Sequence, residues 1–384
     1  MTDGRGLRRM MRRLALLTVC AVAWIGHADA ESFENGRLEV YISSHADLQA
    51  GRYVLEEEIV RFISEARETL DVAVQEIRWS EQGRWPIPDA ILAAARRGVQ
   101  VRVIVEGDYY DEHRPGNLAF FRRLEREPGV EVMRDGNPAI FHHKFVIRDA
   151  EGENAALLTG STNFTDTGTR ANYNHIVVVN FPPLSRPPSY YAMLERYQDE
   201  FDEAWGGVFG KYRPGEEPLR AWIGRTYVRV YFAPDHNPAH HLLDLLCGAR
   251  ESLDVMVFTF ASSSPLMAGI INRWFTWEHQ RARDSAAERR LRVAMESQQA
   301  QYWSAYPALV AIGAPVRLER NPNAKLHHKV AIIDGRQVIL GSYNWTRPAN
   351  NQNDENILVL SSRAVADLFT AAFDELWHDV LVAP

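Results

Sequence analysis

The 384-residue sequence repeats itself, and this repeat constrains the fold more than any other feature. Residues 66–72 (ARETLDV) return as residues 249–255 (ARESLDV), and residues 201–205 (FDEAW) return as residues 373–377 (FDELW). The period of about 185 residues is far longer than the units of solenoids and propellers, which reach only about 50 residues. The sequence therefore predicts two homologous halves fused in one chain.

Within the halves, helix-like and strand-like segments alternate. Residues 55–68 have the spacing of an amphipathic helix and precede a β-rich run at residues 70–74. Residues 87–97 predict a second helix, which ends at Gly98 before a buried strand at residues 99–105. This alternation predicts an α/β fold with a largely parallel sheet covered by helices on both faces.

The chain is expected to consist of four parts. Residues 1–30 form a signal peptide, residues 31–208 the first half, residues 209–226 a linker rich in Gly, Pro and charge, and residues 227–384 the second half. Each half contains one copy of the polar pattern described below.

The signal peptide is predicted from three successive features. Five arginines precede an apolar run from Leu14 to Ile25, and Ala28-Asp29-Ala30 supplies a small-x-small cleavage pattern. The apolar run is short for a membrane span. We therefore expect cleavage after Ala30 and a periplasmic or secreted protein.

The charge and the cysteines limit the possible partners. The first thirty residues contain five arginines and two aspartates, a net charge of +3, so the remaining chain carries −10 compared with −7 overall. An acidic surface gives no general attraction to nucleic acid. Cys247 is the one cysteine after Ala30, which excludes an intramolecular disulfide and a cysteine-based zinc site. We expect no metal and no other cofactor.

Each half contains one copy of the pattern His-x-Lys-x4-Asp within strand-like surroundings. The residues are His142, Lys144 and Asp149 in the first half and His327, Lys329 and Asp334 in the second. Because residues i and i+2 of a strand share a face, each His should project beside its Lys, whereas His143 and His328 should face away as packed residues.

A turn and a second β-rich run follow each copy and end in Gly-Ser-x-Asn, which predicts a hairpin. The glycine would let the backbone approach a ligand closely. The serines and asparagines offer uncharged donors to phosphate oxygens, and the lysines supply the charge. These predicted phosphate-binding residues are Ser161, Asn163, Ser342 and Asn344.

The doubled pattern resembles the phospholipase D superfamily over nearly all of residues 38–380. The resemblance implies two α/β/α sandwich halves related by a pseudo-twofold axis, with one active site at their interface. It also implies covalent catalysis without a metal: one His attacks phosphorus, and the other protonates the leaving alcohol and then activates water. The lysines and asparagines would stabilise the phosphoryl oxygens, and Asp149 and Asp334 would give structural or electrostatic support.

The family usually places an acidic residue a short way after Gly-Ser-x-Asn, bonded to the catalytic histidine of the same half. Glu355 lies at this position in the second half, and the same count in the first half gives Asn174. A carboxylate favours a protonated ring, whereas an amide only orients it. We therefore expect His327, paired with Glu355, to be the general acid, and His142, paired with Asn174, to be the nucleophile.

These residues are compatible with two kinds of substrate and with one alternative reaction. The first is a phosphatidylcholine-like phospholipid, cleaved on its head-group side to phosphatidic acid at a membrane surface. The acidic protein, the export signal and aromatic residues expected near the cleft favour it, and such aromatics are equally common in a buried core. These aromatics are Trp79, Tyr109, Tyr110, Trp303 and Trp345.

The second possible substrate is DNA or RNA, whose bases could stack on the same aromatics, although the chain lacks a basic surface. The third possibility is phosphatidyl transfer, as in cardiolipin synthesis, although those enzymes usually keep membrane-spanning segments. A non-catalytic phosphate or membrane binder should have lost a His or Lys, and both patterns are intact. Because one chain supplies both halves, no obligate protein partner is implied.

Overall fold

A computed structural model describes residues 31–78, 85–110, 115–184, 188–210, 217–284 and 289–383. The expected signal peptide lies outside the described residues and stays a prediction. None of the described helices combines the length and the apolar character that a membrane span requires.

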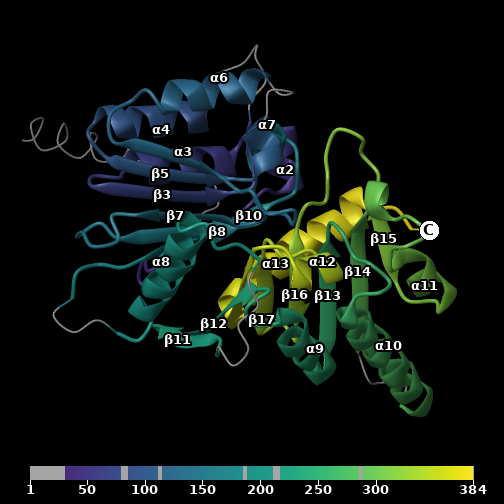
Figure 1. Cartoon of the computed structure of the whole chain (residues 1–384). Helices are drawn as coiled ribbons and strands as arrows, with labels where there is room; N and C mark the ends of the chain where they lie inside the picture. Colours follow the sequence, from purple (N-terminus) through teal and green to yellow (C-terminus); the bar gives the residue numbers. More distant parts are fainter. Residues whose placement is uncertain are drawn as a thin grey trace, which may run out of the picture. The chain divides into compact units, whose positions relative to one another are not determined.

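Each half of the chain folds around one eight-stranded sheet, and corresponding strands take corresponding places in the two sheets (Figure 1). The first sheet has the order β1 (Glu31–Phe33), β2 (Leu38–Ile42), β10 (His175–Asn180), β8 (Ala156–Gly160), β7 (Lys144–Arg148), β3 (Thr69–Val74), β5 (Gln100–Val105) and β6 (Val130–Arg134). The second sheet has the order β11 (Leu219–Ile223), β12 (Thr226–Ala233), β18 (Glu355–Ser361), β17 (Gln337–Gly341), β16 (Lys329–Ile333), β13 (Ser252–Val257), β14 (Arg290–Glu296) and β15 (Val316–Glu319). The duplication is thus confirmed strand by strand.

The strands are mostly antiparallel, so the expectation of a largely parallel sheet is wrong. Among the described strands, β3, β5 and β6 run parallel, as do β13, β14 and β15. The other neighbours in both sheets pair antiparallel. Helical crossovers connect the parallel neighbours, such as β3 and β5 through α4, whereas each His-x-Lys-x4-Asp strand (β7 or β16) turns directly into a hairpin with β8 or β17.

Helices cover the outer face of each sheet. The first sheet packs on α3 (Val54–Ser64), α4 (Pro86–Arg96) and α6 (Pro115–Leu124), and the second on α9 (Pro238–Gly248), α10 (Pro265–Arg283) and α11 (Tyr306–Ala311) (Figure 1). Helix α4 begins with Pro86, whose fixed φ suits the first helical position. It ends before Gly98, whose φ of +93° favours glycine.

The inner faces of both sheets share one apolar core. Phe145 of β7 and Val330 of β16 belong to the same buried cluster as Tyr197 of α8 (Tyr191–Trp205) and Phe369 of α13 (Arg363–Glu375). The two halves are therefore joined by continuous apolar packing as well as by the chain. The remaining short elements are α2 (His45–Gln49), α5 (Gly107–Tyr110), α7 (Asp166–Arg170), α12 (Arg347–Asn351), η1 (Ser297–Gln299), η2 (Leu376–Val380) and the parallel pair β4 (Ile77–Arg78) and β9 (Phe164–Thr165).

Two sequence-based boundaries differ from the structure. Helix α3 ends at Ser64 rather than residue 68, because the backbone N–H groups of Arg67, Glu68 and Thr69 donate to the carboxylate of Asp149. The predicted linker, residues 209–226, is too long at its carboxyl end, since residues 219–223 form β11 at the edge of the second sheet. Residues 211–216 of the linker lie outside the described part of the chain.

Candidate active site

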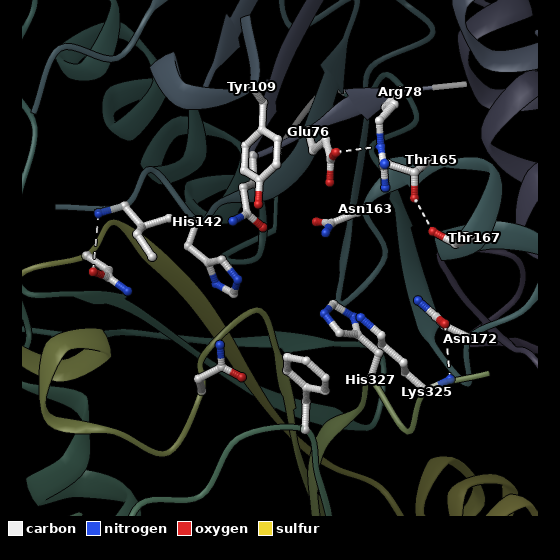
Figure 2. Close-up of a pocket in the computed structure, with 15 residues that line it drawn as sticks. Glu76, Arg78, Tyr109, His142, Asn163, Thr165, Thr167, Asn172, Lys325 and His327 are labelled. Carbon is white, nitrogen blue, oxygen red and sulfur yellow. Dashed lines mark hydrogen bonds and ion pairs between the residues drawn. The ribbon is translucent and has the colours of Figure 1, made fainter. Parts of the chain in front are cut away.

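A polar pocket of about 410 Å³ contains residues of both halves (Figure 2). The rings of His142 and His327 face it from opposite sides (Figure 2). The other lining residues are Gln75, Glu76, Arg78, Tyr109, Ile140, Asn163, Thr165, Thr167 and Asn172, together with Phe258, Lys325, Asn344 and Asn353. Its volume suits a phosphate and the groups attached directly to it.

Backbone hydrogen bonds connect the two halves directly beside the histidines. The N–H of His142 donates to the carbonyl of Asp354 at 2.9 Å, and the N–H of His327 donates to the carbonyl of Tyr173 at 3.0 Å. Each contact belongs to an isolated parallel bridge between a segment of one half and a segment of the other. The halves are therefore held in register at the positions where their histidines enter the pocket.

His142 is oriented by a carboxylate of the other half. Its Nδ1–H donates to Oε2 of Glu355 at 2.6 Å, and Glu355 is completely buried. The hydroxyl of Ser342 donates to the same oxygen at 2.6 Å. The same-half pairing of Glu355 with His327 that the sequence analysis expected is wrong.

His327 is oriented by an amide of the other half. Oδ1 of Asn174 accepts from Nδ1 of His327 at 2.9 Å, while Nδ2 of Asn174 donates to the carbonyl of Gly168 at 2.8 Å. That second bond fixes the amide orientation, so Nδ1 of His327 must carry the hydrogen, and Nε2 is its free nitrogen.

The exchange of partners has a simple structural cause. Asn174 and Glu355 each directly follow a bridge residue, Tyr173 or Asp354, that pairs with the other half. Each side chain is thereby brought to the histidine across the interface rather than to the histidine of its own half.

The serines of Gly-Ser-x-Asn, which were predicted to bind phosphate, do not line the pocket. Ser161 and Ser342 are fully buried, and their hydroxyls donate to Asn174 (2.8 Å) and Glu355 (2.6 Å). They are positioning residues for the histidine partners. Asn163 and Asn344, by contrast, line the pocket (Figure 2 labels Asn163), where their amides can reach a bound phosphate.

The glycines of the same pattern are required by the sheet rather than by a ligand. A Cβ on Gly160 would lie 2.3 Å from the carbonyl oxygen of His175, and a Cβ on Gly341 would lie 2.2 Å from that of Asn356. Gly341 also has a φ of +134°, which favours glycine. The backbone of each glycine therefore lies close to the neighbouring strand, whereas a close approach to a ligand was expected.

Both lysines lie behind the histidines. Nζ of Lys144 donates to the carbonyl of His142 at 2.8 Å and to Gln75 at 3.3 Å, and Nζ of Lys329 donates to the carbonyl of His327 at 2.8 Å. Both are buried, which lowers the pKa of Lys144 to about 7 and that of Lys329 well below its ordinary value. A bound phosphate would restore the charge on both ammonium groups.

The electrostatics of the pocket favour an anion. Burial lowers the pKa of His142 and of His327 well below the usual range, and the two lysines lower both further. Burial raises the pKa of Glu355 to about 8, against the opposing effect of Lys144. An anionic diester would favour the protonated forms of the rings and lysines, so binding and catalytic protonation are coupled.

Two residues of the predicted catalytic set lie elsewhere. Asp149 and Asp334 follow the far ends of β7 and β16, and neither lines the pocket. Asp334 accepts from the backbone N–H groups of residues 250–252, as Asp149 does from residues 67–69. Both have positive φ, +49° and +54°. They fix a turn, so of the structural or electrostatic support expected of them the structure favours the structural role, and a direct catalytic role is not retained.

The neighbouring histidines face away from the pocket, as strand alternation predicted. Nε2 of His143 lies 2.9 Å from Glu200, and His328 stacks on His175 with their Nδ1 atoms 3.0 Å apart.

The candidate aromatics separate into different environments. Tyr109 lines the pocket, Trp303 is partly exposed, and Trp345 is buried against Phe260. Trp79 and the side chain of Tyr110 lie outside the described residues.

Several lining residues were not predicted from the sequence. Gln75 and Phe258 follow the equivalent strands β3 and β13, and Asn172 and Asn353 precede the equivalent bridges. The duplication could have identified them, because each residue has an equivalent in the other half that also lines the pocket. Lys325, two residues before His327, was also missed.

The fold and the site together define a duplicated α/β protein with two His-Lys pairs in one interface pocket. A family model described as "Cardiolipin synthase, PLD-like domain" matches residues 59–205 and 242–377, so the chain belongs to this phospholipase D-like family. Its curated relatives include the mitochondrial cardiolipin hydrolases of Chlamydomonas reinhardtii (33% identical over 147 residues) and Xenopus laevis (34% over 139 residues). These matches cover 37% and 36% of this chain and 59% and 60% of the relatives' lengths.

A solved structure supports the fold across both halves. The phosphatidylserine synthase of Haemophilus influenzae Rd KW20 superposes with a TM-score of 0.60, covering 89% of this chain and 87% of that one, at 12% identity. The predicted fold class is confirmed. At this identity the similarity concerns the fold alone.

Proposed function

We propose that the protein is a phosphoric diester hydrolase that cleaves phospholipids on the head-group side and releases phosphatidic acid. The observation that carries the proposal is a pair of histidines, one from each half, that face one polar pocket. Each has its Nδ1 hydrogen bonded to a partner residue, which leaves Nε2 available for the reaction. The names of the curated relatives support a lipid rather than a nucleic acid substrate, and the acidic chain opposes a nuclease.

His142 is assigned as the nucleophile. When the Glu355 carboxylate accepts the Nδ1–H of His142, Nε2 has a free lone pair. As Nε2 bonds to phosphorus, positive charge develops on the ring, and the carboxylate at 2.6 Å stabilises it. The expected roles are kept although the partners are exchanged, because the Glu355 carboxylate is now assigned to stabilising the charge on the nucleophile rather than to keeping an acid protonated.

His327 is assigned as the general acid. Its partner Asn174 is uncharged, so it orients the ring without stabilising the imidazolium, and the ring gives up its Nε2 proton readily. In the first step the phosphorus–oxygen bond to the head group breaks and that oxygen takes the proton. In the second step Nε2 of His327 accepts a proton from water, the water oxygen bonds to phosphorus, and the bond to His142 breaks.

Substrate access is proposed to occur at a membrane surface. The pocket is polar and small, so acyl chains would remain outside it. Partly exposed Trp303 and strongly exposed Tyr302 lie on a loop whose backbone pairs with residues 261–262, shortly after Phe258 of the pocket. Aromatic side chains of this kind favour a membrane interface. Residues 1–30 support an exported location.

The test uses the chain from residue 31 with phospholipid vesicles, plasmid DNA and single-stranded RNA, beside the variants His142→Ala and His327→Ala. Head-group release that both substitutions abolish, with nucleic acid left intact, is the expected result. Nuclease activity without lipid hydrolysis would overturn the lipid assignment. Added ethanol distinguishes hydrolysis from transfer, since transfer yields phosphatidylethanol in place of phosphatidic acid.

A further inference from the structure

Ile140 and Lys325 occupy matched positions in the two halves. Each lies two residues before a pocket histidine, and each lines the pocket. The backbone N–H of Ile140 donates to Oδ1 of Asn353 at 3.3 Å, and that of Lys325 donates to Oδ1 of Asn172 at 3.1 Å. Because the two halves hold these positions in the same way, the difference between them is in the side chains, one apolar and one cationic.

The Lys325 side chain extends toward the His327 ring (Figure 2). Its charge contributes to the lowered pKa of His327, which agrees with this proximity. Nζ lies 5.9 Å from the centre of the Phe258 ring. The pocket is therefore cationic on its His327 side and apolar at the equivalent place on its His142 side.

Lys325 forms no ion pair within the described residues. The buried carboxylate of Glu296, whose raised pKa the charge of Lys325 partly offsets, instead accepts the backbone N–H of Leu326 at 2.9 Å. The other exposed cation of the pocket, Arg78, is paired with Glu76 at 2.7 Å. Lys144 and Lys329 are buried beneath the histidines and donate to their backbone carbonyls. Among these four cations, Lys325 is therefore the one that both lines the pocket and forms no ion pair within the described residues.

We propose that Lys325 forms a second anion subsite, which selects phospholipids whose departing head group carries its own negative charge, such as a second phosphate. This inference rests on the proposed function, in which His327 protonates the leaving oxygen. In an in-line displacement that oxygen lies opposite His142, so the head group leaves on the Lys325 side. A zwitterionic head group would bring its cationic end toward Lys325, which is unfavourable.

The kinetic test compares cardiolipin and phosphatidylcholine in neutral detergent micelles. Lys325→Met should lower the ratio of kcat/KM for cardiolipin over phosphatidylcholine by about 10-fold or more, as expected for loss of a charge-assisted contact. Lys325→Arg should retain most of the ratio. Arg336→Met, which removes an exposed cation from the β16–β17 turn, should leave the ratio unchanged. An equal ratio in the parent and Lys325→Met would overturn the subsite.

The swap Ile140→Lys/Lys325→Ile keeps both side chains but exchanges their sides. It should not recover the cardiolipin preference, because the cation then lies beside the nucleophile. Recovery would show that charge anywhere in the pocket suffices, and it would contradict the assigned side.

A binding measurement separates this proposal from hydrolysis. Calorimetry with inorganic phosphate and with pyrophosphate should show tighter binding of pyrophosphate to the parent, and Lys325→Met should remove most of that preference. Equal binding of the two anions by the parent would overturn the subsite even if lipid is hydrolysed. Preference for pyrophosphate without hydrolysis of either lipid would support the anion subsite, overturn the lipid function and remove the assignment to a lipid head group.

Discussion

Glu355 of the second half hydrogen bonds to His142 of the first, with 2.6 Å between Oε2 and Nδ1. The corresponding partner of His327 is Asn174, at 2.9 Å. Each half therefore orients the histidine of the other, and the two histidines have partners of different charge.

The first prediction concerns this pair. Glu355→Gln should lower kcat by on the order of 10²- to 10⁴-fold, as loss of a carboxylate behind a catalytic histidine does in comparable triads. A phosphoenzyme trapped by rapid acid-free quenching should carry its phosphate on His142. Phosphate found on His327 would mean that Glu355 keeps His142 protonated as the acid, and would reverse both roles.

Asn174→Asp should change the pH dependence in a defined direction. Burial lowers the pKa of His327, so its protonated form, and with it kcat, declines as the pH rises. A carboxylate at residue 174 would raise that pKa, and the basic limb of the kcat profile should move to higher pH by about one unit. Asn174→Ala serves as the control for loss of orientation. An unmoved basic limb in Asn174→Asp would contradict the role of His327.

Ser342→Ala and Ser161→Ala distinguish positioning from phosphate binding. Both should reduce kcat with little change in KM, since the hydroxyls contact Glu355 and Asn174 rather than the pocket. The effect of Ser342→Ala should be larger, about 10-fold, because its acceptor is the catalytic carboxylate. A rise in KM without loss of kcat would restore the phosphate-binding role.

Asp149→Ala and Asp334→Ala should affect stability more than chemistry. Each leaves three backbone N–H groups without their acceptor, at a cost of about 1–3 kcal/mol in the free energy of unfolding. Asn at either position keeps one acceptor and tolerates positive φ, so it should recover part of the stability. Urea denaturation with kcat measured on the folded fraction checks this. A normal unfolding midpoint with lost kcat would place the aspartates in the reaction.

The duplication made much of the site predictable. It located His142, Lys144, His327 and Lys329, and a residue count found Asn174 and Glu355 although their pairing was assigned to the wrong halves. The pairing depends on where β10 and β18 begin relative to the interface, which is a tertiary property that spacing along one chain does not contain.

Strand direction and side-chain exposure could likewise not be predicted from the sequence. The hairpins β7–β8 and β16–β17 were predicted from their turns. The antiparallel pairings of β10 with β2 and of β18 with β12 were missed, because these strands lie far apart in the sequence. Ser161 was interpreted from its hydroxyl alone, and only the packing shows that it faces Asn174. Lys325 was not singled out from the sequence, because only the packing shows that it lines the pocket.

The reciprocal exchange of histidine partners has a consequence for the origin of the site. A symmetric dimer of the first half would place Asn174 beside both copies of His142, and a symmetric dimer of the second half would place Glu355 beside both copies of His327. Neither assembly could distinguish its two histidines chemically. Fusion of two diverged halves therefore permits specialisation, because a single substitution at residue 174 or 355 changes one histidine and leaves the other intact.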